Sequence, residues 1–234
     1  MNGRDPGLGW VMPGADVPAL LAPIADALPG LRGEDLTRFF PPPEDARASA
    51  VLILLGESGD GAEGHADLDV LIIERAHDMR AHAGQPAFPG GAADTGDRDP
   101  IETALREAVE ETGLDATGVE VFGLLPDLWV PVSNFVVTPV LAWWRHPSPV
   151  QPMDLAEVAS VHRISVAELV DPANRARVRH PSGYVGYGFA VRDLLVWGFT
   201  AGLLTGLLDL AGWSVPWDES RILDLQPDAW EEPV

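Results

Sequence analysis

One stretch of the sequence, residues 100–112, constrains the fold more than any other because it carries the signals that begin and end a helix. Proline stands at its first position, and an aspartate just before it, Asp97 or Asp99, can cap the amides of the first turn. Gly113 follows and favours the left-handed conformation in which helices commonly end. We therefore predict a helix over residues 100–112.

The predicted helix carries chemistry on one face and packing residues on another. Residues three or four apart share a helix face, so Glu107, Glu110 and Glu111 lie together. An apolar stripe on a different face can pack against a sheet. It consists of Ile101, Leu105, Ala108 and Thr112. Adjacent carboxylates repel one another, so the acidic face is either a divalent-metal site or a solvated surface of an acidic protein.

Composition narrows the function classes. The chain has 234 residues, 46% of them hydrophobic, which indicates one globular domain with additions, or two small domains. A net charge of −21 argues against a nucleic-acid partner, because phosphate backbones require a basic surface. No cysteine is present, so disulfides, thiolate nucleophiles and cysteine-bound metals are excluded. The sequence contains arginine but no lysine, so cationic contacts to phosphate must come from Arg or His.

Hydrophobic patterning predicts strands before and after the acidic helix. The predicted strands cover residues 48–55, 69–74, 120–124, 135–144 and 158–164. Helical segments are predicted at residues 17–28, 166–169 and 194–210. This order favours an α/β fold with a mixed sheet flanked by helices. The uncharged run from residue 194 to 208 is shorter than the roughly 20 residues that span a membrane, so we expect a buried helix and no membrane contact.

A glycine-containing loop, Pro89-Gly90-Gly91, precedes the helix and allows backbone to approach a ligand closely. Gly91 followed by Arg106-Glu107-Ala108-Val109-Glu110-Glu111-Thr112-Gly113-Leu114 resembles the Nudix box. Every fixed position of the second half matches. In the first half Asp97 replaces the usual glutamate, and one extra residue separates it from Arg106, so the partner of Arg106 is Asp97 or Asp99. The resemblance implies a Nudix-type α/β/α sandwich with a mixed sheet.

The resemblance also implies a domain organisation. We expect an N-terminal extension over residues 1–46, a Nudix hydrolase domain over residues 47–212 that ends in the long C-terminal helix, and an acidic tail over residues 213–234. No charged leader followed by an apolar run begins the chain, and we expect a cytoplasmic location. Family resemblance further implies a homodimer.

A second motif lies upstream of the helix. Leu71-Ile72-Ile73-Glu74-Arg75-Ala76, then Arg80 to Gln85, then Phe88-Pro89-Gly90-Gly91 is similar to the signature of the coenzyme A pyrophosphatase branch, although Ile73 and Ala76 replace a threonine and a serine. The resemblance covers about residues 50 to 210. It implies substrate contacts from Arg75, Arg80, His82, Gln85, Phe88, Gly90 and Gly91.

Each of these assignments has a structural alternative. Arg75 and Arg80 either contact phosphate or pair with the nearby acids Glu74 and Asp78. The imidazole of His82 either contacts the ligand or makes a structural hydrogen bond, and the ring of Phe88 either covers a ligand ring or closes the core.

Together the two motifs predict hydrolysis of the diphosphate bond of coenzyme A to 4′-phosphopantetheine and 3′,5′-ADP. We expect Mg²⁺, or Mn²⁺ in its place, to bind Glu107, Glu110 and Glu111, while Arg106 orients the carboxylates. Glu107 or Glu157 is the expected base that activates water. Two alternatives stay open: another nucleoside diphosphate derivative such as ADP-ribose, NADH or a dinucleoside polyphosphate, or a Nudix-like module that binds a nucleotide without cleaving it.

Overall fold

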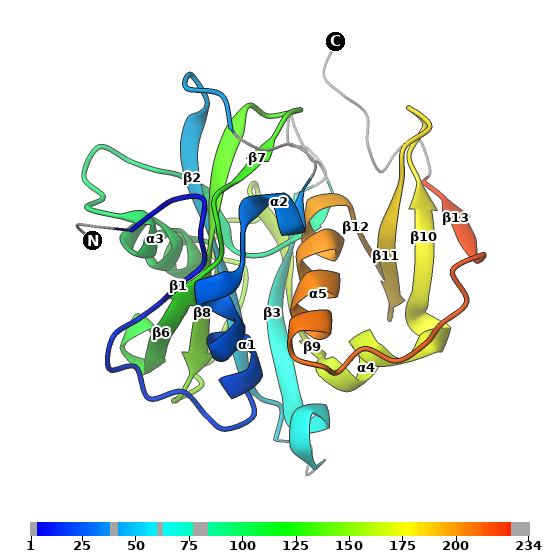
Figure 1. Cartoon of the computed structure of the whole chain (residues 1–234), viewed down its shortest axis with the longest axis horizontal. Coiled ribbons are helices and arrows are strands. Elements are labelled where there is room, and N and C mark those ends of the chain that lie inside the picture. The colour runs from blue at the N-terminus through cyan, green and yellow to red at the C-terminus, as the bar shows by residue number, and fades with distance from the viewer. Residues whose placement is uncertain (1–3, 38–41, 60–62, 77–83, 226–234) are drawn as a thin grey trace. The chain divides into compact units, whose positions relative to one another are not determined.

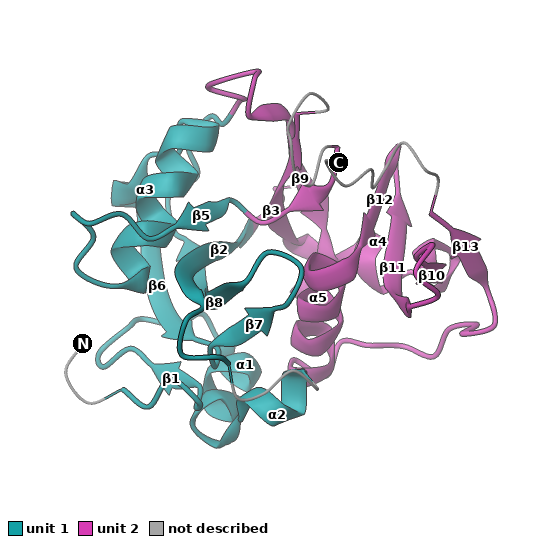
Figure 2. Cartoon of the chain, turned by 90° about the horizontal axis from the view of Figure 1, so that it is seen from above, with its two compact units in different colours: residues 1–56, 89–150 teal, residues 57–88, 151–234 magenta. Residues whose placement is uncertain are grey.

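The computed structural model describes residues 4–37, 42–59, 63–76 and 84–225. The chain divides into two compact units, shown in different colours in Figure 2. Unit 1 consists of Met1–Gly56 and Pro89–Val150, and unit 2 consists of Glu57–Phe88 and Gln151–Val234. The acidic helix and the glycine loop before it both belong to unit 1.

Unit 1 is built on a mixed sheet (Figure 1). Its longest strands are β2 (Arg47–Glu57) and β8 (Phe135–Trp144), which pair in parallel, and β6 (Val119–Leu124) runs antiparallel to β8. Shorter strands lie alongside: β1 (Trp10–Val11) on β6, β5 (Gly90–Ala92) on β2 and β7 (Leu128–Val130) on β8. The predicted mixed sheet is confirmed.

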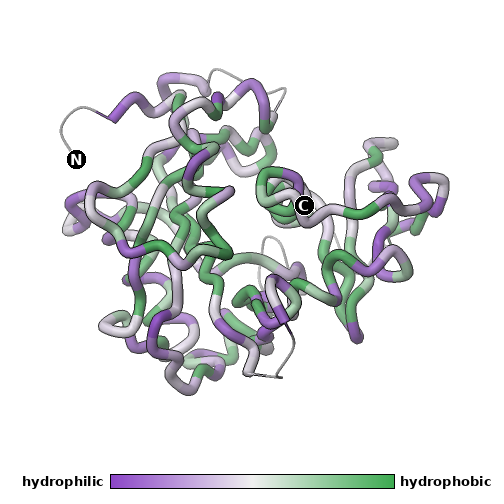
Figure 3. Tube along the Cα trace, turned by 60° about the horizontal axis from the view of Figure 1, so that its bottom comes forward, coloured by the Kyte–Doolittle hydropathy of each residue, from purple (hydrophilic) through white to green (hydrophobic). Residues whose placement is uncertain are grey.

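Helices cover the unit 1 sheet. Helix α3 (Pro100–Thr112) contacts β5 and β8, and Figure 2 shows α1 (Ala22–Ala27) on the opposite side of the sheet from α3. Two short helices, η1 (Leu28–Gly30) and α2 (Gly33–Leu36), follow α1, and η3 (Ala116–Gly118) follows α3. Because helices lie on both faces, the long strands β2 and β8 are mostly buried. Figure 3 shows hydrophobic stretches, in green, alternating with hydrophilic ones, in purple, along the trace.

Unit 2 contains strands of two sheets. Strand β3 (Leu68–Arg75) pairs antiparallel with β9 (Val158–Ser165) and with β4 (Pro86–Ala87). The second sheet has the order β12-β11-β10-β13. Its strands are Leu194–Trp197, Val185–Val191, Arg175–Arg179 and Ile222–Asp224 in that order. The helices of this unit are η2 (Gly64–Asp67), α4 (Val166–Val170), η4 (Pro172–Asn174) and α5 (Gly198–Leu210).

The prediction of one helix over residues 194–210 is wrong at its beginning. Residues 194–197 form β12, which pairs antiparallel with β11, and the helix begins only at Gly198. Leu194 and Val196 are buried whereas Leu195 and Trp197 are half-buried, the alternation of a strand. Gly198 has a φ of 64°, a left-handed conformation that separates strand from helix. An apolar run alone does not distinguish the two structures.

Two further predictions differ from the structure. The helix expected over residues 17–28 is confined to Ala22–Ala27, because Pro23 begins the regular turn and a 3₁₀ turn follows at Leu28. The sheet formed by β10, β11 and β13 was not expected from the sequence.

In the part of the chain that the structure describes, no helix is long and apolar enough to cross a membrane, and α5 has 13 residues.

Candidate active site

Helix α3 begins and ends where local chemistry requires. The Asp99 carboxylate accepts the N–H groups of Ile101 and Glu102 at 3.0 and 3.1 Å, so Asp99 is the cap. At the other end Gly113 has a φ of 69°, and its N–H donates to the carbonyl of Val109. The helix bounds are those predicted from the sequence, and the carboxylate of Asp97 is left for another role.

Arg106 is the centre of the candidate site because all five of its N–H donors have acceptors. Its Nε and Nη2 form a two-pronged pair with Asp97, at 3.1 and 3.0 Å, and Nη2 also donates to the carbonyl of Ala92 at 3.1 Å. Its Nη1 donates to Oε1 of Glu107 and to Oε2 of Glu110, both at 3.0 Å. Arg106 therefore fixes two of the three predicted metal carboxylates.

Asp97 is the partner of Arg106 that the sequence left undecided between two aspartates. Its side chain is only 6% exposed, and it also accepts the N–H of Asp94 and the hydroxyl of Thr103, both at 2.9 Å. The hydrogen bonds from Arg106, and then from the Asp94 amide, hold the pKa of Asp97 far below its usual range. The same pair raises the pKa of Arg106. Asp97 thus stays ionised and Arg106 stays charged.

Glu111 joins the helix to the glycine loop. It is only 7% exposed, and its Oε2 accepts the N–H of Gly90 at 2.9 Å. The apolar stripe predicted for this helix is only partly right. Ala108 and Thr112 are buried, but Ile101 and Leu105 are half-buried. The buried residues of the helix are Thr103, Ala104, Ala108, Glu111 and Thr112. A hydrophobicity pattern misses Glu111 because its burial depends on a hydrogen-bond donor outside the helix.

Gly91 leaves the space that the Glu107 carboxylate occupies. A Cβ atom at this position would lie 2.6 Å from the carboxylate atoms of Glu107. At Gly90, where φ is 156°, a Cβ would lie 2.3 Å from the carbonyl oxygen of Ala50. Glycine at position 90 avoids overlap with backbone, and glycine at position 91 leaves room for the Glu107 carboxylate.

The three glutamates supply carboxylate oxygens, the type of donor that a hard divalent cation prefers. Glu107 contributes such oxygens beside Gly91, and Glu110 contributes them beside Arg106. Within residues 4–37, 42–59, 63–76 and 84–225, no three acidic or histidine side chains gather closely enough to hold an ion. Each of the three glutamates instead accepts an N–H donor, from Arg106 or from Gly90.

The predicted substrate residues of unit 2 flank a loop between β3 and β4. The backbone N–H of Arg75 donates to the carbonyl of Gln85 at 3.1 Å, and the N–H of Gly84 donates back to Arg75 at 3.0 Å. Phe88 is 3% exposed, which agrees with a core role. Arg80 and His82 lie outside the described residues.

Glu157, the second candidate base, is held beside the end of β3 by its backbone. Its carbonyl accepts the N–H of Ala76 at 2.9 Å, and its own N–H donates to Asp154 at 3.0 Å. The segment before β9 therefore lies beside the end of β3.

One residue of the site was not identified from the sequence. Thr103 is 1% exposed and contacts Asp97 through its hydroxyl. The sequence feature that could have identified Thr103 is its position three residues before Arg106. This spacing places both side chains on one helix face, toward the preceding loop.

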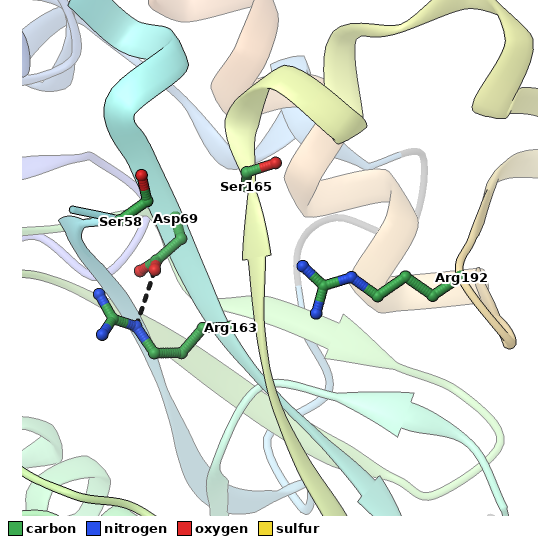
Figure 4. Close-up of a pocket in the computed structure, with 5 residues that line it drawn as sticks. All are labelled: Ser58, Asp69, Arg163, Ser165 and Arg192. Atoms are coloured by element: carbon green, nitrogen blue, oxygen red, sulfur yellow. Dashed lines mark ion pairs between the residues drawn. The ribbon is translucent and has the colours of Figure 1, made fainter. Parts of the chain in front are cut away.

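A polar pocket of about 210 Å³ in unit 2 is shown in Figure 4. It is lined by Ser58, Asp69, Arg163, Ser165 and Arg192. Arg163 pairs with Asp69 at 2.7 Å, and Arg192 forms a two-pronged pair with Glu168 at 2.9 and 2.8 Å. Since each arginine already pairs with a carboxylate, the pocket has balanced charges, and the site around Arg106 is the stronger candidate for chemistry.

Comparison with known proteins identifies the family. A model of the NUDIX domain matches residues 46–182, which is more than half of the chain. A relative from Pectobacterium atrosepticum, described as an uncharacterized Nudix hydrolase NudL, is 39% identical over 146 residues, covering 60% of this chain and 73% of the relative. A NudL relative from Citrobacter koseri is 35% identical over 192 residues, covering 76% of this chain and 86% of the relative.

Among solved structures, the Nudix hydrolase RenU from M. smegmatis has a TM-score of 0.47 at 18% identity, covering 74% of this chain and 91% of that one. The family match spans the glycine loop, Asp97 and the three glutamates of α3. This chain therefore belongs to the Nudix hydrolase family, enzymes that act on pyrophosphate bonds of nucleoside diphosphate derivatives and generally use a divalent metal.

Proposed function

We propose that this Nudix hydrolase cleaves the diphosphate bond of coenzyme A, or of its thioesters, to give 4′-phosphopantetheine and 3′,5′-ADP. The observation that carries the proposal is the arrangement in which Arg106 orients Glu107 and Glu110, while Glu111 binds the glycine loop. The substrate assignment is supported by the motif from Leu71 to Gly91. Within this motif, strand β3 pairs with strand β4.

The three glutamates would hold Mg²⁺, or Mn²⁺ in its place. When bound, such an ion neutralises charge on the diphosphate and on the departing phosphate group. Arg106 holds the carboxylates of Glu107 and Glu110 in fixed orientations, because it donates a hydrogen bond to one oxygen of each. The absence of a side chain at Gly91 leaves room for the Glu107 carboxylate beside β5.

The chemical step is attack of water on phosphorus. The water oxygen forms the new bond, the bond from phosphorus to the bridging oxygen breaks, and the bridging oxygen leaves with the electron pair. A carboxylate takes the proton of the water, and Glu107 and Glu157 are the two candidates. In the motif from Leu71 to Gly91, Arg75, Arg80, His82 and Gln85 are the proposed substrate contacts.

The deciding experiment is incubation of the full chain with coenzyme A and Mg²⁺, followed by mass analysis of products. We expect 4′-phosphopantetheine and 3′,5′-ADP, and no turnover when the metal is chelated. A parallel panel contains ADP-ribose, NADH and a dinucleoside polyphosphate. A tenfold preference for ADP-ribose would contradict the coenzyme A assignment, and absence of metal-dependent cleavage of every diphosphate would indicate a non-catalytic module.

The remaining expectations concern location and assembly. We propose a cytoplasmic protein, because its sequence contains no cysteine. We also propose a homodimer on the basis of family resemblance. Light scattering of the purified chain measures its mass directly, and a monomeric mass at working concentration would contradict the dimer.

A further inference from the structure

We propose that Thr103 is a positioning residue for the metal carboxylates, acting on them through Asp97 and Arg106. The inference rests on the proposed function, because it concerns how the glutamates of that site are arranged. Thr103 itself is 1% exposed and touches none of the three glutamates in the hydrogen bonds described. Its effect must therefore pass along a chain of three hydrogen-bonded side chains.

The first link joins Thr103 to Asp97. The Thr103 hydroxyl lies 2.9 Å from Oδ2 of Asp97 and 3.4 Å from the carbonyl of Asp99. A hydroxyl has one hydrogen to donate, and the carboxylate is both the closer and the charged acceptor. The geometry therefore assigns this hydrogen to Asp97.

The second link is the orientation of the Asp97 carboxylate. Oδ2 accepts from Thr103, from the Asp94 amide and from Nη2 of Arg106, while Oδ1 accepts only Nε of Arg106 among the bonds described. Two donors outside Arg106 thus fix Oδ2 from the helix and from the loop. With both in place, the plane of the carboxylate faces the edge of the guanidinium, as a two-pronged pair requires.

The third link is the rigidity of the guanidinium. Its five donors lie in one plane, so a rotation at the Asp97 edge moves Nη1 at the other edge as well. Nη1 is the atom that donates to Glu107 and Glu110, each at 3.0 Å. Loss of the Thr103 hydrogen bond should therefore disturb the two carboxylates although Thr103 does not contact them.

Space beside Thr103 makes the inference testable with little structural damage. Thr103 and Asp97 border a cavity of about 260 Å³ that Asp127 and Thr138 also line. Valine has nearly the same shape as threonine and replaces the hydroxyl with a methyl group, so Thr103→Val removes the hydrogen-bond donor with little change in volume. A matched control exists in the same helix, because Thr112 is also fully buried and its hydroxyl donates to the carbonyl of Ala108.

The experiment compares Thr103→Val, Thr103→Ser and Thr112→Val with the wild-type chain. Binding of Mn²⁺ alone is measured by electron paramagnetic resonance, and the Mg²⁺ concentration for half-maximal hydrolysis is measured separately. We expect Thr103→Val to weaken Mn²⁺ binding by roughly 10-fold, as loss of a group behind a metal ligand commonly does. Thr103→Ser keeps the hydroxyl and should bind as the wild type does, and Thr112→Val should also match the wild type.

The outcomes separate the inference from the proposed function. If the wild type binds Mn²⁺ and hydrolyses substrate, but Thr103→Val matches Thr112→Val in both measurements, the positioning role is wrong and the function stands. If the wild type neither binds Mn²⁺ nor cleaves any diphosphate, the function itself is wrong. Should Thr103→Val fail to fold, Thr103→Ala takes its place in the same comparison.

Discussion

At the scale of single residues, the candidate site depends on which polar groups find partners. Two aspartates before α3 have similar sequence positions but different roles, since Asp99 caps the helix and Asp97 binds Arg106. Glu111 is nearly buried, whereas the side chain of Glu110 is 57% exposed. The three glutamates are therefore not equivalent, and the buried one should be the most sensitive to loss of charge.

Glu111→Gln tests this sensitivity. The amide oxygen of glutamine can still accept the Gly90 N–H, so we expect the fold to persist while the charge is lost. We expect kcat to fall by about 10²–10³-fold, the range for removing one electrostatic contact to the reacting groups. Steady-state kinetics and thermal melting provide the two measurements.

Glu102→Gln is the matched control for that change. Glu102 lies on the same helix, and it pairs only with exposed Arg98 at 2.9 Å among the ion pairs described. We expect its activity to be that of the wild type. Activity in Glu111→Gln equal to that in Glu102→Gln would show that Glu111 plays no part in catalysis.

At the scale of elements, the site is a junction between β5 and α3. The glycines of β5 lie against the helix closely enough that a single Cβ at Gly91 would overlap the Glu107 carboxylate. The long, flexible end of a glutamate can move aside, unlike backbone, so the overlap should displace Glu107 rather than unfold the chain. The contact therefore affects catalysis more than stability.

Gly91→Ala is expected to lower kcat/KM by at least about 10-fold, because misplacement of a catalytic group by 1 Å can cost 10²-fold. The melting temperature should change little. The matched control is Gly96→Ala in the following loop, where an added Cβ meets no atom within 4 Å. Equal kcat/KM in the two variants would contradict the role given to Glu107.

At the scale of the whole molecule, residues before the family match contribute to the core of unit 1. Leu21, Ile24 and Leu28 are fully buried, and β1 pairs with β6. A Cβ built on Gly123 of β6 would lie 2.3 Å from a methyl group of Leu28, so the two segments are in close contact. The extension is therefore expected to fold together with unit 1.

Leu28→Ala should reduce the free energy of unfolding by about 2–5 kcal/mol, the usual cost of emptying a buried leucine site. Urea denaturation followed by circular dichroism measures it. Leu20→Ala is the control, because Leu20 is 39% exposed and should change stability by less than about 0.5 kcal/mol. If the N-terminal extension contributed nothing to the core of unit 1, Leu28→Ala and Leu20→Ala would have the same free energy of unfolding.

Much of the fold and of the candidate site follows from local sequence. Helix α3 has the predicted bounds because its cap and its terminal glycine act within a few residues. Strand β8 also has its predicted bounds, since a long apolar run of β-branched and aromatic residues favours a strand. The spacing of Glu107, Glu110 and Glu111 predicts a metal-binding face on this helix, and the family match spans these residues.

Other features were decided only by tertiary structure. The choice of Asp97 over Asp99 for Arg106, the burial of Glu111 and the role inferred for Thr103 depend on where the loop before α3 lies. Residues 194–197 became a strand because β11 offered backbone partners. The sequence by itself determined where α3 begins and ends, because its cap and its terminal glycine act over one or two turns. Hydrogen bonds and strand pairings between distant residues exist only once the chain has folded, and so tertiary structure determined the partner of each charged group.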